Sequence, residues 1–303
     1  MKRLHLTNTV VMISPDTFGY NIQTAETNLF QHKPSTSEEN IKNMALNEFE
    51  KMVSTLKSHN INVLVMNSRR NIVTPDAVFP NNWFSSHESA LVIYPMLAHN
   101  RRSERQVDNL RKILPTDSLK VIDLSEDEQK GLILEGTGSL VLDRKVKLAY
   151  ALWSKRTTKE EFDKWCKLMG YQGIFFTGVD DDNYPVYHTN VVMSIGEDFA
   201  VICLESIASK EERQLMTETL KESGKEIIEI SLIQMKNFCG NILQLISTDK
   251  KRKIIMSKNA HNSFTSKQKK ALSKYGELVE VDIATIEKIG GGSARCMMTE
   301  IFL

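Results

Sequence analysis

One order of secondary-structure elements repeats about five times along the chain, and this repeat limits the possible folds more than any other feature. Apolar residues at helical spacing begin near residues 38, 101, 158, 209 and 266, at steps of 63, 57, 51 and 57 residues. A β-rich run follows each helix, at 61–66, 119–124, 172–176, 225–231 and 277–283. Two more strand candidates precede the next helix, as at 187–195 with 199–205 and at 238–246 with 252–257. Self-similarity at a nearly fixed period is typical of a ring or an array, not of two stacked domains.

The two ends of the chain are expected to close the ring. A buried strand is predicted at 9–14, and a capping pattern of Ser35 with Glu38 is expected to begin the first long helix. The apolar residues after Cys296 indicate a final strand without a following partner, so we expect it to pair with 9–14. No linker interrupts the pattern. The sequence therefore predicts one α/β domain over residues 1–303, built from strand-strand-helix-strand units.

Composition narrows the class of partner. The chain has 39 basic and 38 acidic residues, a net charge of +1, which argues against nucleic acid or a membrane surface as a partner and favours a small polar molecule. Its four cysteines form no CxxC pair, so we expect neither a disulfide framework nor a thiolate metal site. Residues 1–11 lack the apolar core of a signal peptide, and no run reaches transmembrane length. We expect a cytoplasmic, metal-free protein; a homo-oligomer remains open.

A glycine-rich stretch near the C-terminus presents a cysteine. Gly290, Gly291 and Gly292 are entropically costly, so they indicate positive φ or close backbone packing directly before Cys296. Arg295 beside the thiol is expected to favour the thiolate, the nucleophilic form of cysteine. An ordinary glycine turn with a buried cysteine is the alternative.

Two further residues have the chemistry that a cysteine nucleophile needs. His188 follows Val186 and Tyr187 among apolar strand candidates, and Glu135 lies in another apolar run before Gly136. An imidazole supplies a base, and a carboxylate inside an apolar segment is rarely buried without a partner. The alternatives are a core histidine bonded to the backbone and a strand-end glutamate that reaches solvent.

Asparagines mark two other candidate segments. Asp76, Asn81 and Asn82 beside Trp83 predict a polar pocket with donors and acceptors, or else a tight turn with an aromatic anchor. The segment 237–241 contains two asparagines and Cys239, and it either lines the pocket or forms a buried turn.

Four segments together resemble one superfamily. DAVFPNNWFSSH, LEGTGSLVLDR, YHTNVVM and GGGSARCM, in this order, resemble the guanidino-group-modifying enzymes, also called penteins, and within them the citrulline utilisation hydrolases. The resemblance covers nearly the whole chain. It implies a five-bladed α/β propeller with pseudo-fivefold symmetry, a fold that would require the fivefold repeat, and an amino-acid substrate without a cofactor.

The resemblance also implies roles for the site residues. Cys296 attacks the central carbon of a guanidino or ureido group, which gives a covalent S-alkyl intermediate. His188 moves protons, and Glu135 binds substrate nitrogens. Arg156 matches a position that holds the substrate carboxylate. Arg101 or Arg102 is a second clamp, unless this pair lies on a solvated helix face.

The chain departs from the deiminases of this superfamily at two positions. Asn82 and Asn190 stand where those enzymes place carboxylates that pair with a guanidinium cation. Neutral amides suit a neutral ureido group better, so the sequence favours hydrolysis of citrulline over that of arginine, with Asp76 as one remaining anion. The alternatives are an arginine deiminase or dihydrolase, an amidinotransferase, and a non-catalytic binding propeller.

Overall fold

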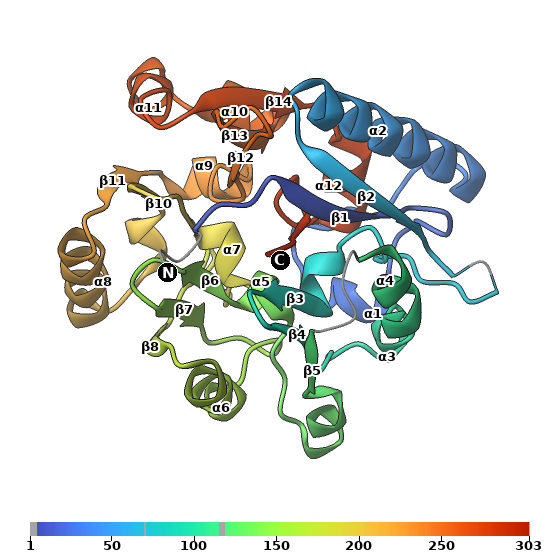
Figure 1. The fold of residues 1–303 in the computed structure, drawn as a ribbon, viewed down its shortest axis with the longest axis horizontal. Coiled ribbons are helices and arrows are strands. Elements are labelled where there is room, and N and C mark those ends of the chain that lie inside the picture. Colours follow the sequence, from blue (N-terminus) through green and yellow to red (C-terminus); the bar gives the residue numbers. More distant parts are fainter. Residues whose placement is uncertain (1–4, 70, 115–118, 303) are drawn as a thin grey trace.

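Five small sheets of three strands each make up the framework of the fold. The computed structural model describes residues 5–69, 71–114 and 119–302; residues 1–4, part of the segment examined for a signal peptide, lie outside it. In spatial order the sheets are β15(Thr299–Glu300)–β1(Thr9–Ser14)–β2(Asn62–Asn67), β3(Phe84–His87)–β4(Ala90–Ile93)–β5(Lys120–Asp123), β6(Val141–Asp143)–β7(Leu148–Leu152)–β8(Gln172–Phe176), β9(Met193–Ile195)–β10(Phe199–Ile202)–β11(Glu226–Glu229) and β12(Leu243–Ile246)–β13(Arg252–Ser257)–β14(Glu277–Val281). They lie around a common centre (Figure 1).

Every sheet has the same topology. One outer strand pairs antiparallel with the middle strand, and the other outer strand pairs parallel with it. The two parallel strands are joined through helical segments, because parallel neighbours need a long crossover connection. The crossover helices are α2(Glu38–Ser58), α3(His99–Arg102) with α4(Val107–Ile113), α6(Lys159–Met169), α8(Lys210–Glu222), and α10(Lys258–Ser263) with α11(Ser266–Leu272). Of these, the helices α2, α4, α6, α8 and α11 lie toward the outside of the fold (Figure 1). The predicted strand-strand-helix-strand repeat is confirmed.

The ends of the chain meet in the first sheet. β15 pairs antiparallel with β1, where Val10 lies opposite Glu300 and Val11 opposite Thr299. The predicted pairing of the two ends is therefore confirmed, although β15 is only two residues long. The strand expected after Cys296 begins only at Thr299, because residues 294–297 form a turn.

The long helix α2 shows how the sequence positions an element. Ser37 caps its N-terminus by accepting a hydrogen bond from Asn40 N, so the expected capping box of Ser35 and Glu38 is wrong. Ile41, Ala45, Phe49, Met52 and Leu56 form its buried stripe.

Short helical turns interrupt the predicted strands near the centre of the fold. α5(Gly136–Ser139) and α7(Thr189–Val192) replace the expected strand structure before β6 and β9. Likewise, β12 begins only at Leu243, five residues later than predicted. The sequence predicts strands in these buried segments because they are apolar, but in the structure they lie outside the sheets and help to form the site.

The remaining helices are α1(Ile22–Ala25), η1(Pro80–Asn82), η2(Ser125–Lys130), η3(Leu204–Ser206), α9(Leu232–Lys236) and α12(Ala284–Gly290). Among the described residues, no helix is long and apolar enough to cross a membrane.

Candidate active site

Glu135 is positioned by the turn into α5. Gly136 has φ +46°, and a Cβ there would collide with the carbonyl oxygen of Asn81, so the Leu-Glu-Gly pattern needs its glycine. The Glu135 carboxylate is fully buried and accepts a hydrogen bond from Leu97 N at 3.1 Å. Burial alone would raise the pKa of Glu135, but Arg156 and His188 lower it to about 2. The group is therefore a buried anion.

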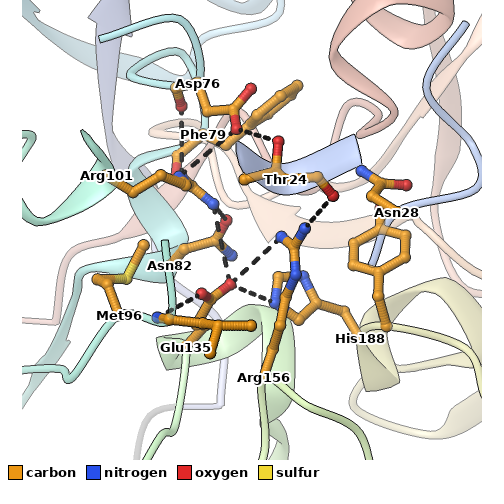
Figure 2. A network of polar contacts seen from close by, with 12 residues as sticks. Thr24, Asn28, Asp76, Phe79, Asn82, Met96, Arg101, Glu135, Arg156 and His188 are labelled. Carbon is orange, nitrogen blue, oxygen red and sulfur yellow. Dashed lines mark hydrogen bonds and ion pairs between the residues drawn. The ribbon is translucent and has the colours of Figure 1, made fainter. Parts of the chain in front are cut away.

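His188 lies directly before α7 and faces Glu135. Its Nε2 is 2.9 Å from Glu135 Oε2 (Figure 2). Burial lowers the pKa of His188 to about 4, against the opposite effect of Glu135, so the imidazole is neutral near pH 7. Since Glu135 is ionised, Nε2 carries the proton and donates it, which leaves Nδ1 free to accept one.

Cys296 lies at the other end of the same site. Its Sγ is 3.2 Å from Asn241 Nδ2 and 3.5 Å from Asn190 Nδ2. Asn190 Nδ2 also lies 3.2 Å from the carbonyl oxygen of Thr137 in α5, which links the thiol to the segment that carries Glu135. The thiol is thus held among neutral amides.

The expected thiolate is not the state that the free site favours. Burial raises the pKa of the Cys296 thiol above its usual value, despite lowering contributions from the Ser293 backbone, Asn241 and Arg295. Arg295 Nη2 donates to Glu300 at 3.0 Å, and Nη1 donates to the Met298 carbonyl. The expected direction for Arg295 is confirmed, because Arg295 lowers the pKa of the thiol, but burial has the larger effect.

The three glycines allow the close packing that the sequence predicts. Gly291 has φ +65°, and a Cβ there would lie 2.6 Å from Asn28 Nδ2. Cβ atoms at Gly290 and Gly292 would approach the Phe79 ring to 2.8 and 2.9 Å. The loop before Cys296 therefore requires glycine at each position.

Arg156 and Asp76 are joined by the segment around α1. Arg156 Nε and Nη2 donate to Thr27 Oγ1 at 3.0 and 2.8 Å, and Nη2 also donates to the Thr24 carbonyl. Asp76 Oδ2 accepts from Thr24 Oγ1 at 3.0 Å (Figure 2). It also accepts from Asn21 Nδ2 at 2.7 Å. The other oxygen, Asp76 Oδ1, is buried and has no hydrogen-bond partner. Such an oxygen calls for a ligand.

Arg101 is buried against protein partners. Its Nε and Nη2 donate to both oxygens of Glu104 at 2.9 Å, and its Nη1 donates to Asn82 Oδ1 at 2.7 Å. Nη2 also faces the carbonyl oxygens of Asp76 and Phe79. In this state the guanidinium orders the wall of the site.

The other expectations for the clamp and the asparagines have mixed outcomes. Arg102 pairs with Glu128 at 3.3 Å and donates to the Met96 carbonyl, apart from the buried cluster. Asn82 Oδ1 accepts a hydrogen bond from Arg101 Nη1, and Asn82 Nδ2 donates one to Asn81 Oδ1. The solvated alternative for the 101–102 pair is thus wrong for Arg101.

Asn241 contacts the thiol, so the pocket-lining alternative holds for this residue. Sequence reasoning missed three other residues that build the site. The hydroxyl of Tyr187 donates to the Gly291 carbonyl, and Thr24 and Thr27 hold Asp76 and Arg156. One indication for Tyr187 was present in the sequence, since it directly precedes His188. The two threonines lie in a loop whose role depends on the folded chain.

Other sites of potential chemistry are separate. The remaining cysteines are free and buried, and burial raises the pKa of Cys166 and Cys239 to about 12 and of Cys203 to about 11. Within the described residues, Asp180–Asp182 form the group of carboxylates close enough to share a metal ion, on an exposed loop.

Comparison with known proteins shows the class of protein. The chain is a member of the guanidino-group-modifying, or pentein, superfamily of enzymes. A family model described as N,N dimethylarginine dimethylhydrolase, eukaryotic, matches residues 14–303, and the chain belongs to this family. No curated protein matches the chain by sequence.

Solved structures share the fold. The N-terminal domain of ArgZ bound to substrate, from an arginine dihydrolase of cyanobacteria, has 17% identity and a TM-score of 0.74, covering 97% of this chain and 99% of that one. AgrE with ornithine and NAD+ has 18% identity and a TM-score of 0.75, and the match covers 97% of this chain but 39% of AgrE. DDAH from Pseudomonas aeruginosa with citrulline has 15% identity and a TM-score of 0.68, covering 98% and 100%.

Proposed function

We propose that this protein is a cysteine-dependent hydrolase of the ureido or guanidino group of a free amino acid, with citrulline as the favoured substrate. We infer that the five sheets form the five-bladed propeller of the superfamily as one domain. The observation that carries the proposal is the convergence of a buried thiol between two carboxamides with a neutral imidazole held by a carboxylate.

The polar cluster opposite the thiol fits the amino-acid end of the substrate. Asp76 Oδ1 lacks a partner in a buried place, which an α-ammonium group would supply. Thr24 connects Arg156 to Asp76, because its carbonyl oxygen accepts from Arg156 and its hydroxyl donates to Asp76. The planar guanidinium of Arg156 suits an α-carboxylate. Arg101 completes the positive side, with Glu104 as its permanent partner.

The proposed reaction has two steps. Cys296 Sγ attacks the ureido carbon, and ammonia leaves with a proton relayed by His188, which gives an S-carbamoyl intermediate. Water then attacks this carbon while His188 accepts its proton. The released carbamate breaks down to ornithine and carbon dioxide. Glu135 holds the imidazole and accepts from substrate nitrogens throughout.

The neutrality of the thiol's surroundings supports a neutral group there. Asn190 and Asn241 can donate to a ureido oxygen and accept from its nitrogens, whereas a guanidinium would find Glu135 as the nearby carboxylate, already paired with Arg156 and Arg101. A buried cation with too few anions costs on the order of several kcal/mol.

One observation favours a second candidate, hydrolysis of arginine. Because the pKa of the Cys296 thiol is raised, substrate binding must help to form the thiolate. A guanidinium cation would lower this pKa, and a neutral ureido group would not. ArgZ, a similar structure, is an arginine dihydrolase. An amidinotransferase would use an amine in place of water, and a binding propeller would need no reactive thiol.

Access and compartment follow from the same features. Cys296, His188 and Glu135 are each at most 3% exposed, so substrate entry requires part of the surrounding chain to move. Four unpaired cysteines support a reducing compartment such as the cytoplasm.

The test is to incubate the purified protein separately with citrulline and arginine and to follow the products by mass spectrometry. Cys296→Ala is the inactive variant, and Cys203→Ala is the matched control. Ornithine and ammonia from citrulline, absent in Cys296→Ala, support the proposal. Citrulline or ornithine formed from arginine favours the second candidate. No turnover of either substrate overturns both.

A further inference from the structure

A small cavity lies behind the nucleophile, on the side away from Asp76 and Arg156. Its volume is about 30 Å³, room for about one or two water molecules or one small ion. Residues of β6, β9 and β12 line it, together with Thr137 and Asn190. Asn190 also contacts Cys296 Sγ, so the cavity adjoins the support of the thiol.

The cavity wall carries excess positive charge. Arg144 and Arg295 both line it, and each is nine-tenths buried or more. Arg295 pairs with Glu300, which also lines the cavity, whereas the salt bridges of the described residues include none to Arg144. Arg144 instead contacts His87 Nδ1 at 3.2 Å and lies 4.0 Å above the Phe302 ring. The nearby Lys225–Asp143 pair is internally balanced at 2.8 Å.

Two buried polar atoms of the lining lack partners. Ser194 is 7% exposed, and its hydroxyl makes no hydrogen bond. His5 Nδ1 is likewise without one, and burial lowers the pKa of His5 to about 4, so this imidazole adds no charge near pH 7. Buried polar groups are nearly always satisfied, so something polar occupies the space.

We propose that this cavity binds one small monovalent anion, a halide or bicarbonate, between Arg144, Arg295 and the hydroxyl of Ser194. The anion would balance the guanidinium that has no carboxylate and satisfy the free hydroxyl. Arg144 also lowers the pKa of Arg295, so the two cations repel each other, and an anion between them relieves this repulsion. Water alone would satisfy the hydroxyl but not the charge.

An anion at this place would act on Cys296. Arg295 lowers the pKa of the thiol, and an anion beside Arg295 cancels part of that effect. The thiolate fraction then falls at any given pH. Small anions in this cavity would thus lower the reactivity of Cys296 without competing with the substrate for Asp76 and Arg156.

Occupancy is tested with bromide, whose anomalous scattering identifies it in crystals of the full chain. We expect a bromide peak between Arg144 and Ser194 in the parent and its loss in Arg144→Gln. Water density in crystals soaked in bromide and also in crystals soaked in bicarbonate, or a bromide peak that persists in Arg144→Gln, overturns the proposal.

The effect on the thiol is tested by iodoacetamide alkylation of Cys296 at constant ionic strength, which needs no knowledge of the substrate. We expect chloride or bromide to slow alkylation roughly threefold relative to sulfate, about half a pKa unit, in the parent but not in Arg144→Gln. Ser194→Ala, which removes the free hydroxyl, should weaken the effect. Bicarbonate acting where chloride does not would identify it as the ligand. Equal rates in all salts overturn the coupling.

Discussion

Glu135 and His188 face each other across 2.9 Å although 53 residues separate them in the chain. Each lies directly before a four-residue helix, α5 or α7, and these helices pack together at the centre of the fold. The carboxylate fixes the imidazole with Nε2 protonated, which keeps Nδ1 available for proton transfer. This pair connects the substrate cluster to the nucleophile.

We predict that Glu135→Gln lowers kcat/KM by about 10²-fold or more, because the amide no longer orients or supports a protonated His188. Loss of the anion also leaves Arg156 and Arg101 less well paired, so the unfolding free energy should fall. Steady-state kinetics and urea unfolding measure the two effects. Glu161→Gln is the matched control: Glu161 is buried without a hydrogen bond, and burial raises its pKa to about 7. Equal kinetic loss in both variants would contradict the assigned role.

Gly138→Ala should impair the site while leaving the fold in place. A Cβ at this position would lie 2.8 Å from His188 Nδ1 and would clash with the Asn82 amide, so the ring must move. We expect kcat to fall at least tenfold, since small displacements of a catalytic group are costly. Gly19→Ala is the control, because its Cβ would meet no atom within 4 Å. A Gly138→Ala enzyme with parental kcat would show that the ring tolerates the methyl group.

Asn190→Asp tests why amides surround the thiol. A carboxylate 3.5 Å from Sγ should raise the pKa of Cys296 further and slow its alkylation at fixed pH. The same charge would help to pair a guanidinium, so the ratio of kcat/KM for arginine to that for citrulline should rise about tenfold. Asn237→Asp, at a half-buried position beside α9, is the control for added charge. An unchanged ratio would remove the electrostatic argument for substrate choice.

The repeat predicted the sheets because hydrophobic periodicity records which faces are buried. It could not predict the site segments, since a fully buried turn such as α5 is as apolar as a strand. Arg101 shows a second limit of prediction from sequence. Its partner Glu104 follows three residues later, a spacing that indicates an ion pair on a helix, but the burial of both groups depends on the folded chain. Asn241 contacts Cys296 across 55 residues, a proximity that only the ring closure creates.

His5 provides a prediction for stability against pH. Its pKa is about 4 in the folded chain and 6.5 in an unperturbed histidine, so the unfolded state binds more protons between these limits. The stability that His5 contributes is complete above pH 6.5 and is lost as the pH falls toward 4. Buried carboxyls with raised pKa, such as Glu104 at about 7, act in the opposite direction, so only the difference between variant and parent isolates the histidine. Between about pH 7 and about pH 5, urea unfolding should show the parent losing about 2 kcal/mol more than His5→Gln. His32→Gln, at an exposed position, should follow the parent. If His5→Gln also follows the parent, folding leaves the pKa of His5 unshifted, and at about pH 5 a charged His5 would add to the positive side of the cavity behind Cys296.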